Sequence, residues 1–406
     1  MTLQTYNDIL EYLKSLIRNT VWENHLYAVG GCVRDEFLGR EINDVDLAVD
    51  LPDGGVKFAT WLLKYRKTTG KPVFFRKFGT ARIRLRRFSD QEIELVQTRA
   101  EKYSDHSSRC PEVVSGDIKD DCFRRDFTVN TLYRNISTGE VLDITGRAFQ
   151  DIREGVLRTP LDPYETFDDD PVRILRCLRF AARFNWTIDS AVMEALRKSV
   201  GRLTIVSRER WNAEFTKMLL GRNVRKSLGV LNEIGGLRLM NQTMFEMSAK
   251  TPYPGCPTLL ESAVEAVASL DDEGVDDPVM RFAAFFGNIG MLRAGVVDRN
   301  GELRYPRHEH TGALMAKRIL RRMRVGENLA HEVGEIMRKK GDERMRIEKQ
   351  RRMERHLETQ KCQQEAKRRK KQEKAKRHRA MLAEHARKRC DKFADSLAVF
   401  QQNVED

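Results

Sequence analysis

The sequence predicts an α/β head followed by an all-α remainder and a basic C-terminal tail. Three observations support this fold class. Short β-like runs fill residues 1 to about 145, the pattern becomes helical after about Leu161, and Lys and Arg accumulate beyond Arg338. The chain of 406 residues exceeds what one hydrophobic core usually serves, so two or more domains are expected.

The head is expected to begin with a helix at Tyr6–Arg18. Clusters of Gly and Asp, Asn or Ser then separate short runs that are typical of strands. These runs are Leu26–Val29, Val45–Val49, Ala81–Arg86 and Glu92–Gln97.

Helices are expected beyond the head, and no internal repeat of fixed period occurs. The clearest are Pro171–Phe184, Ser190–Ser199 and Arg208–Leu220, with weaker helices to about Arg338. This pattern predicts four parts: a head at residues 1–150, a helical neck at 151–222, a helical body at 223–335 and a tail at 336–406.

The net charge of +13 comes from the tail. Between Arg338 and Cys390 the sequence has 22 Lys or Arg and 8 Asp or Glu, so the rest of the chain is close to neutral. A basic balance suggests a polyanionic partner such as nucleic acid. The tail has no Pro and no sustained heptad, which argues against a coiled coil. We expect a solvated, partly helical extension, and non-specific contact with RNA or DNA is compatible with it.

The sequence predicts a protein without a membrane span. No run approaches eighteen apolar residues, and the N-terminus lacks a basic-then-apolar signal pattern. The seven cysteines are scattered and form no C-x-x-C pair. Free thiols in a reducing compartment are therefore expected, with neither a disulfide framework nor a zinc site, and the predicted location is cytoplasmic.

The segment YAVGGCVRDEFLGREINDVDLAVD is the most informative stretch of the head. Gly30 and Gly31 follow a predicted strand, where residues without a Cβ allow a backbone to approach phosphate closely. Arg34 can pair with phosphate oxygens, and Asp35 can fix the arginine or the turn. A simple turn is the alternative for the two glycines.

The same segment ends in two aspartates at i and i+2, Asp44 and Asp46. On a strand this spacing places both carboxylates on one face. Two convergent carboxylates suit Mg²⁺, and a pair of such ions can clamp an in-line phosphoryl displacement. D-x-D alone is also common on protein surfaces.

In this order and spacing, the glycine pair and the aspartate pair resemble the signature of polymerase-β-like nucleotidyltransferases. The resemblance is to class II tRNA nucleotidyltransferases (CCA-adding enzymes) and bacterial poly(A) polymerases, strongly over residues 5–235 and weakly over 236–330. It implies a catalytic polymerase-β-like head in which Asp44 and Asp46 hold Mg²⁺. By position Glu94 looks like the family's third carboxylate, and a solvated strand-face charge is the alternative.

The block DDCFRRDFTVNTLYRN resembles the family's R-R-D-F-T-x-N motif, which faces the ribose and triphosphate of the incoming nucleotide. Arg124 and Arg125 can neutralise phosphate, and Asp126 can accept from a ribose hydroxyl. Asn130 lies one helical turn later. The alternative is a helix start with Asp126 as its N-cap, and both interpretations can hold.

The segment TFDDDPVRILRCLRFAARF opens the helical part, with Asp170 suited to the N-cap and Pro171 to the first helical position. Its apolar residues fall on one arc of the helix and its arginines on the other, so a solvated arginine face is one interpretation. The apolar arc holds Ile174, Leu175, Leu178, Ala181 and Ala182, and the other arc holds Arg173, Arg176, Arg179 and Arg183.

This segment also resembles the family's E-D-x-x-R motif, which reads the Watson–Crick edges of CTP and ATP without a template. The resemblance places Asp169 at the Glu position, one methylene shorter, Asp170 at the Asp position and Arg173 at the Arg position. Arg173 offers fixed donors to cytosine, and Asp170 can orient it for adenine. The remaining arginines implied by the resemblance are Arg176 for nucleotide binding and Arg179 and Arg183 for RNA binding.

Two later segments are expected to be structural. SRERWNAEFTKMLLG, with Ser207 as a helix cap, resembles the family's last neck motif and would support the base-reading helix. Residues 280–324 look like an HD-type phosphohydrolase domain, but Gly287 and Asn288 replace the adjacent His and Asp that bind metal. We expect a scaffold without phosphohydrolase activity, or an unrelated helical body.

The expected function is template-independent transfer of CMP and AMP from CTP and ATP to the 3′ end of tRNA, with release of diphosphate. Poly(A) addition, or addition of A or CC alone, is the alternative within the same chemistry, because such family members share every motif above. A catalytically inactive RNA-binding protein is the alternative of another class, and the intact Asp44/Asp46 pair argues against it.

Overall fold

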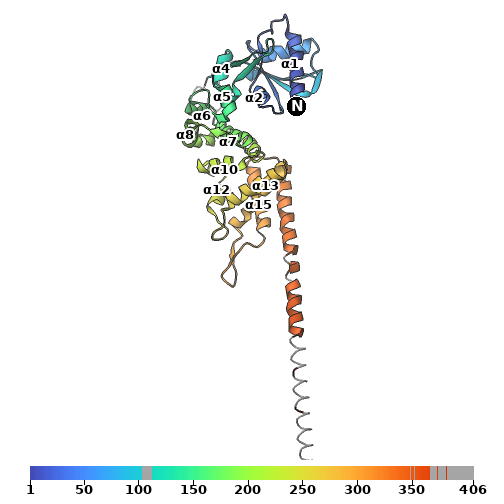
Figure 1. The fold of residues 1–406 in the computed structure, drawn as a ribbon, viewed down its shortest axis with the longest axis vertical. Helices are drawn as coiled ribbons and strands as arrows, with labels where there is room; N and C mark the ends of the chain where they lie inside the picture. The colour runs from blue at the N-terminus through green and yellow to red at the C-terminus, as the bar shows by residue number, and fades with distance from the viewer. Residues whose placement is uncertain (103–111, 348, 352, 366–372, 374–380, 382–406) are drawn as a thin grey trace, which may run out of the picture. The chain divides into compact units, whose positions relative to one another are not determined.

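The computed structural model describes residues 1–102, 112–347, 349–351, 353–365, 373 and 381. It divides into two units, Met1–Arg338 and Lys339–Asp406. The first unit contains a head built on a seven-stranded sheet, followed by helices (Figure 1). The predicted α/β head with a helical remainder is confirmed.

The head sheet is mixed. Strands β2 and β5 are parallel neighbours, and the other neighbouring strands are antiparallel. β1 and β2 have the predicted bounds, while three strands of the sheet, β3, β8 and β9, were not predicted. The strand order is β3 (Val73–Phe75), β4 (Thr80–Leu85), β5 (Phe88–Gln97), β2 (Val45–Val49), β1 (Leu26–Val29), β8 (Leu132–Asn135) and β9 (Val141–Asp143).

One face of this sheet is covered by helices. Apolar residues alternate along the strands, so that Leu47 and Leu95 point to the same buried face. The helices α1 (Leu3–Ile17) and α3 (Gly54–Lys64) pack on that face with apolar stripes at helical spacing. The opposite face, called the open face below, is covered only in part, where Cys122 of α4 packs on β1, β2 and β8. It carries Asp46 and Glu94 side by side in the register of β2 and β5.

Shorter elements complete the head. A separate pair, β6 (Arg99–Lys102) and β7 (Glu112–Ser115), leads to α4, whose N-terminus carries a capping box from Asp117 and Asp120. The remaining elements are α2 (Gly31–Phe37), η1 (Arg76–Phe78), α4 (Ile118–Phe123), η2 (Thr128–Asn130) and α5 (Ala148–Glu154).

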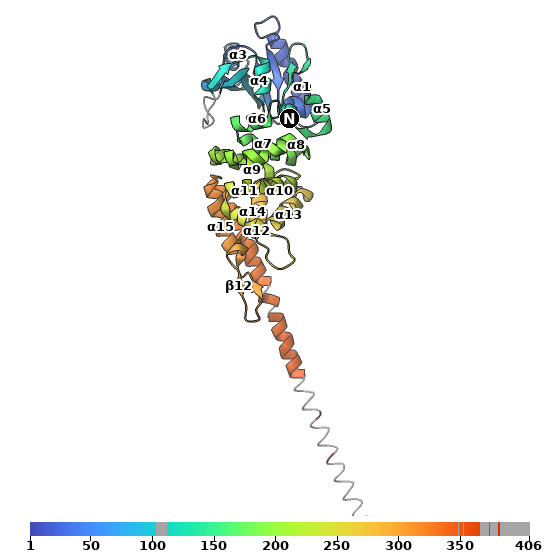
Figure 2. The ribbon, with the colours of Figure 1, turned by 90° about the vertical axis from the view of Figure 1, so that its left-hand side faces the viewer.

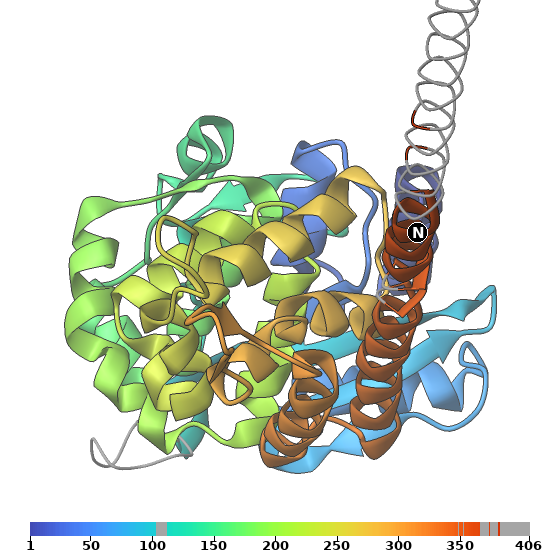
Figure 3. The same cartoon turned by 90° about the horizontal axis from the view of Figure 1, so that it is seen from below.

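The helices after the head follow one another with short connections. Figure 2 shows α6 to α9 (green) between the head and the helices α10 to α15 (yellow to orange), and Figure 3 shows the same helices in front of the head strands. Two short pairs, β10–β11 (Val156–Leu157, Thr187–Ile188) and β12–β13 (Val296–Val297, Leu303–Arg304), interrupt the helical pattern.

Three of these helices, α7, α8 and α9, match the predicted bounds to within one residue. The elements are α6 (Pro163–Asp169), α7 (Val172–Phe184), α8 (Ser190–Ser199), η3 (Val200–Ile205), α9 (Arg208–Leu219), α10 (Val224–Glu233), α11 (Gly236–Met240), α12 (Gln242–Ala249), α13 (Leu259–Asp272), α14 (Pro278–Phe286), η4 (Ile289–Leu292) and α15 (His308–Arg322).

Helix α7 differs from the expectation at its start and on its polar side. It begins at Val172, one residue after Pro171, and the Asp170 carboxylate accepts a hydrogen bond from the Val172 N–H. The arginine arc is not a solvated face, because Arg173 and Arg179 are buried. The spacing of residues along one helix could not predict this burial, because it is the head and α9 that cover the arginines.

The second unit is helical where it is described. Residues 339–347, 349–351 and 353–365 form helical turns, and nearly all their side chains are exposed. Most of the predicted tail beyond residue 365 lies outside the described residues. Among the described cysteines, all five are free thiols as predicted; Cys110 and Cys390 lie outside. None of the helices searched in the described ranges is long and apolar enough to cross a membrane.

The close contact of α3 with the sheet predicts a strong effect at Gly55. A Cβ there would lie 2.6 Å from the carbonyl oxygens of Gly79 and Leu95, which belong to the backbone and cannot rotate away. Gly55→Ala should lower the free energy of unfolding by about 1–3 kcal/mol in chemical denaturation. Gly229→Ala is the matched control, because its Cβ would meet no atom within 4 Å inside α10 and should leave stability equal or about 0.5–1 kcal/mol higher. Equal effects of the two substitutions would contradict this account of the α3 contact.

Candidate active site

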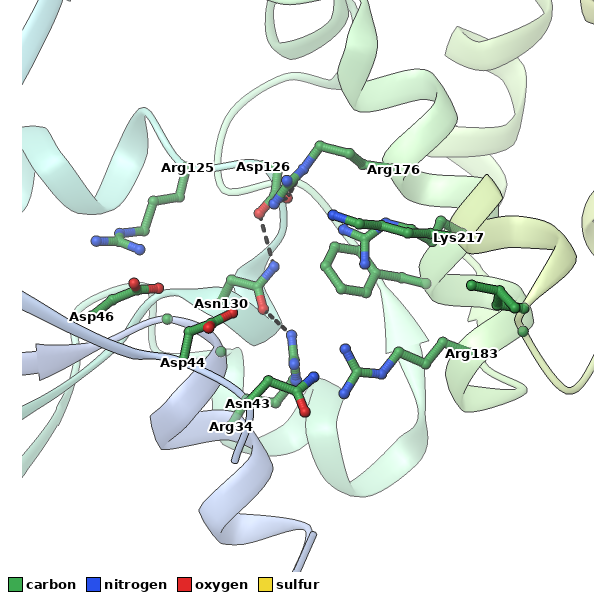
Figure 4. Close-up of a pocket in the computed structure, with 16 residues that line it drawn as sticks. Arg34, Asn43, Asp44, Asp46, Arg125, Asp126, Asn130, Arg176, Arg183 and Lys217 are labelled. Carbon is green, nitrogen blue, oxygen red and sulfur yellow. Dashed lines mark hydrogen bonds and ion pairs between the residues drawn. The ribbon is translucent and has the colours of Figure 1, made fainter. Parts of the chain in front are cut away.

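The two predicted metal-binding aspartates line one cavity of about 600 Å³ between the head and α7. Asp46 is the second residue of β2, whereas Asp44 immediately precedes the strand. The prediction that both aspartates lie on one strand therefore holds for Asp46 and not for Asp44. Figure 4 shows both carboxylates pointing into the space that Arg176, Lys217 and Arg183 face from the other side. The cavity therefore brings carboxylates and cations together.

The Asp46 carboxyl is unusually basic. Burial raises its pKa to about 6, and the carboxylates of Glu94 and Asp44 add to the increase, while the Arg125 guanidinium opposes it. The physical cause is that β2 and β5 place Asp46 and Glu94 opposite each other on a partly covered surface. A bound cation would relieve this accumulation of negative charge.

The donor set fits a hard divalent cation that takes further ligands from a substrate. Asp44 and Asp46 offer carboxylate oxygens, which Mg²⁺ prefers, and magnesium usually combines one or two carboxylates with substrate phosphates. The described part of the chain contains no group of three or more His, Cys, Asp or Glu side chains close enough to hold a metal. Glu94 lies beside Asp46 but does not line the cavity, so its role as a third ligand stays a prediction.

The glycine pair forms the turn between β1 and α2. Gly30 has φ +75°, and a Cβ there would lie 3.1 Å from the Arg125 guanidinium. Gly31 begins α2, where a Cβ would make only an ordinary contact. Both glycines line the cavity, and Gly30 is the position that requires glycine. The predicted approach of their backbone to a phosphate stays a prediction.

The two arginines of the RRD motif are held by a residue that the sequence pattern did not single out. Asp121 is fully buried and pairs with Arg124 and Arg125, and it accepts a hydrogen bond from the Tyr133 hydroxyl at 2.6 Å. Burial alone would raise the pKa of Asp121, but the guanidiniums of Arg125 and Arg124 outweigh it and hold the pKa far below its usual range. The i,i+3 and i,i+4 spacing to the arginines was the available signal.

A series of polar contacts joins the head to α7, and it begins and ends on α7, whose backbone completes a ring. We call it the polar ring, and its members in order are Arg176, Asp126, Asn130, Arg34, Asp35 and Arg183. Asp126 accepts from Arg176 Nε at 2.7 Å and from Asn130 Nδ2 at 2.9 Å. Burial would raise the pKa of Asp126, but the charge of Arg176 and these hydrogen bonds lower it far below its usual range.

Arg34 and Asp35 form the second half of the polar ring. Arg34 Nε donates to Asp35 Oδ1 at 2.8 Å, as the sequence suggested, and its terminal nitrogen donates to the Asn130 side chain. Asp35 also lies 3.5 Å from Arg183 of α7. The Arg34 guanidinium lies 4.6 Å from the centre of the Phe184 ring, which combines a cation–π contact with the ion pair.

Helix α9 supports α7 from behind. Arg179 Nε donates to Glu214 Oε2 at 2.5 Å, and both side chains are nearly buried. Ser207 caps α9 as predicted, and Lys217 reaches the cavity. Arg179 lines the cavity but forms an ion pair with Glu214. Its predicted contact with RNA stays a prediction.

A second hollow of about 360 Å³ adjoins the first and shares Arg125, Asp126 and Arg176 with it. Its walls include Asp170 and Arg173, the residues at the predicted base-reading positions. The two motif residues therefore lie in the same hollow of the folded chain.

The residues at the predicted base-reading positions have hydrogen-bond and ion-pair partners within the protein. Arg173 donates to the backbone carbonyls of Thr166 and Arg124, at 3.1 Å and 2.5 Å. Asp170 pairs with Arg210 of α9 at 2.6 Å, a contact that the sequence did not predict. Asp169 ends α6 and lines neither hollow.

His308, one of the two histidines of the HD-like segment, packs inside the helical body. His308 is buried at the start of α15, with Nδ1 3.0 Å from the Tyr305 carbonyl oxygen. The turn at Gly290 packs so closely on α15 that a Cβ would overlap the His308 carbonyl oxygen. Gly287 and Asn288 follow α14 directly, and the HD-type interpretation of this region stays a prediction.

Two family models match the chain. The model described as the poly A polymerase head domain matches residues 26–158, and the one described as the probable RNA and SrmB-binding site of polymerase A matches residues 185–240. The fold resembles a solved apo structure of a CCA-adding enzyme with a TM-score of 0.56 and 22% identity, covering 80% of this chain and 78% of the other.

Sequence relatives point the same way. The chain is 38% identical over 233 residues to the mitochondrial CCA tRNA nucleotidyltransferase of Saccharomyces cerevisiae, covering 53% of this chain and 42% of the relative. It is 32% identical over 231 residues to the CCA-adding enzyme of Bacillus velezensis, covering 55% and 54%. The chain spans about half the length of the relatives that it matches. Over residues 26–158 and 185–240, the chain is similar to tRNA nucleotidyltransferases and poly(A) polymerases.

Proposed function

We propose that this chain is a template-independent nucleotidyltransferase that adds CMP and AMP from CTP and ATP to the 3′ end of tRNA and releases diphosphate. The observation that carries the proposal is the first cavity, where Asp44 and Asp46 face the arginines of α7 and which the second hollow adjoins. Relatives named as CCA-adding enzymes support the same activity.

In the proposed reaction, the 3′ hydroxyl oxygen of the RNA attacks the α-phosphorus of the nucleotide, and the bond to diphosphate breaks. Asp44 and Asp46 would hold Mg²⁺, which when bound lowers the pKa of the attacking hydroxyl and stabilises charge on the phosphoryl oxygens. Arg125, Arg176 and Lys217 line the same cavity and supply positive charge for the triphosphate.

For base selection, we propose that the nucleobase enters the second hollow. Arg173 is fixed by two backbone carbonyls, so its guanidinium presents its remaining donors in one orientation. Asp170 and Arg210 add an acceptor and further donors beside it. Fixed donors and acceptors can select cytosine and adenine by their edges, as the family resemblance implies.

The basic tail and the compartment remain predictions. The described residues 339–347, 349–351 and 353–365 are helical and nearly all their side chains are exposed, which is compatible with contact to RNA phosphates. A cytoplasmic location is likewise a proposal, and one of the relatives is named as a mitochondrial enzyme.

The proposed function is tested with tRNA transcripts that end before CCA, after C and after CC, incubated with Mg²⁺ and with CTP and ATP singly and together. Addition that stops at CCA is the expected result. An adenylate ladder on any RNA would instead identify a poly(A) polymerase, and addition of A or CC alone a partial enzyme. If no nucleotide is incorporated into any transcript, the proposed function is wrong.

Replacing Asp46 by Asn should reduce incorporation by about 10³-fold or more, because the neutral amide is a poor ligand for a hard cation. Retention of the tRNA in a filter-binding assay should not change. Asp53→Asn is the control, since it removes an exposed carboxylate at the start of α3 without touching the cavity. An active Asp46→Asn protein would show that the metal assignment is wrong.

The same substitution should stabilise the metal-free fold. Since the folded pKa of Asp46 is about 6 against about 4 when unfolded, its ionised form destabilises the native state above about pH 6 and not below about pH 4. In EDTA at pH 8, Asp46→Asn should raise the free energy of unfolding by on the order of 2 kcal/mol, and the gain should vanish toward pH 4. Thermal unfolding followed by calorimetry checks this, and added Mg²⁺ should raise the wild-type midpoint more than that of the variant. A gain that does not depend on pH would contradict the electrostatic cause.

Asp170→Asn should change base selection more than overall activity. The amide can still accept from the Val172 N–H, but it loses the ion pair with Arg210 and gains donors toward the base. We expect the ratio of kcat/KM for CTP and ATP to change by about tenfold or more. Asp168→Asn is the matched control, because Asp168 pairs with Arg202 and does not line the second hollow. Equal ratios in the two variants would place base selection elsewhere.

A further inference from the structure

The row of side chains that begins at Asp46 continues across the open face to the edge of the sheet. Asp46 is paired with Glu94 on β5. Glu94 is paired with Arg82 on β4, and Arg82 with Val73 on the outermost strand, β3. Directly paired residues project from the same face, and neighbouring strands lie about 4.8 Å apart. Arg82 is therefore only two strands away from the candidate catalytic carboxylate.

The outer end of this row combines exposed aromatic rings with positive charge. Phe75 and Phe78 are 40% and 42% exposed, and Val73 is 55% exposed. The Arg82 guanidinium lies 5.5 Å from the centre of the Phe75 ring. Residues 71–89 contain seven Lys or Arg and no Asp or Glu. An apolar and strongly basic strip therefore leads away from the cavity.

The arginines of this strip remain available to a ligand. Arg82 and Arg84 approach the same carboxylate, Glu92, at 3.6 Å and 3.5 Å, and all three side chains are about half exposed. Exposed ion pairs at such distances contribute little free energy, so exchange for a phosphate group costs little. One carboxylate also cannot neutralise two guanidiniums.

Protection of the sheet edge explains only part of this pattern. Lys and Arg on an outer strand discourage pairing with another sheet. Here the arginines of the row lie on β4, one strand in from the edge, whereas Phe75 on β3 and Phe78 in the adjoining η1 are exposed and favour association instead. Exposed rings favour a ligand with flat aromatic faces, and exposed arginines favour a ligand with negative charge.

We infer that the edge surface, formed by Val73, Phe75, Phe78, Arg82 and Arg84, binds the single-stranded 3′ end of the RNA and guides it to Asp44 and Asp46. The inference rests on the proposed function and locates its RNA substrate. Single-stranded RNA presents unstacked bases to aromatic rings and phosphates to arginines, whereas the bases of a duplex are already stacked.

The test compares Phe75→Ala and the double variant Arg82→Ala/Arg84→Ala with the full wild-type chain. A 5′-labelled tRNA transcript ending in CC is titrated in fluorescence anisotropy at several salt concentrations. Phe75→Ala should weaken binding by about tenfold, because alanine offers a base no ring to stack on. The double variant should reduce the slope of log K against log salt by about 0.7 for each phosphate that no longer pairs with an arginine. In steady-state assays KM for the tRNA should rise while KM for ATP stays constant.

Two kinds of control keep these results specific. Arg197→Ala removes an arginine of α8 that is 53% exposed and paired with Glu233, and Leu314→Ala removes an exposed apolar side chain of α15; both should leave binding unchanged. The conservative variants Phe75→Tyr and Arg82→Lys/Arg84→Lys should restore most of the affinity and of the salt slope. A blunt-ended RNA duplex should bind equally well to the wild type and to the edge-surface variants.

Several results would overturn the inference. One is affinity and salt slope equal to those of the two controls, and another is an equal loss of affinity for the blunt duplex. Self-association of the variants in analytical ultracentrifugation with unchanged RNA affinity would show that the edge surface serves edge protection. These outcomes are separable from a failure of the proposed function, because that failure is a wild-type protein that incorporates no nucleotide.

Discussion

The ion pair between Asp126 of the head and Arg176 of α7 is the contact on which the site depends. Both groups lie at the boundary of the two hollows, and the pair opens the polar ring that closes through Arg34 and Asp35 on Arg183. Asp126 is buried whereas the Arg176 side chain is 35% exposed, so removing Arg176 would leave a buried carboxylate without its main counter-charge. The two hollows can therefore hold their shape only while the head and α7 stay in contact.

Charge is distributed unevenly among the aspartates around the site. Asp121 and Asp126 keep low pKa values because arginines surround them, whereas the pKa of Asp46 rises to about 6 because it is buried and its nearest neighbours include carboxylates. Two aspartates thus organise cations permanently, and a third is left with excess negative charge. This difference separates groups that maintain the structure from a group that is poised for a cation.

Much of this architecture was predictable from the sequence. The strands Leu26–Val29 and Val45–Val49 are apolar runs bounded by turn residues, and the helices α7 to α9 have clear periodicity, so their bounds were predicted closely. The three-residue strands β3 and β9 are too short to show a period. Apart from the adjacent pair Arg34–Asp35, the contacts of the polar ring could not be predicted, because they join separate segments and the partner of a buried arginine is set by tertiary packing. Asp121 alone had a local signal, its helical spacing to the two arginines.

The parallel pairing of β2 and β5 has a consequence for how the site arises. Parallel neighbours need a crossover connection, which here contains α3 and the hairpin strands β3 and β4. Asp46 and Glu94 therefore become neighbours only when this whole connection is in place. The electrostatic conflict at Asp46 thus belongs to the assembled sheet and to neither strand alone, and the packing of α3 on the sheet has to sustain it.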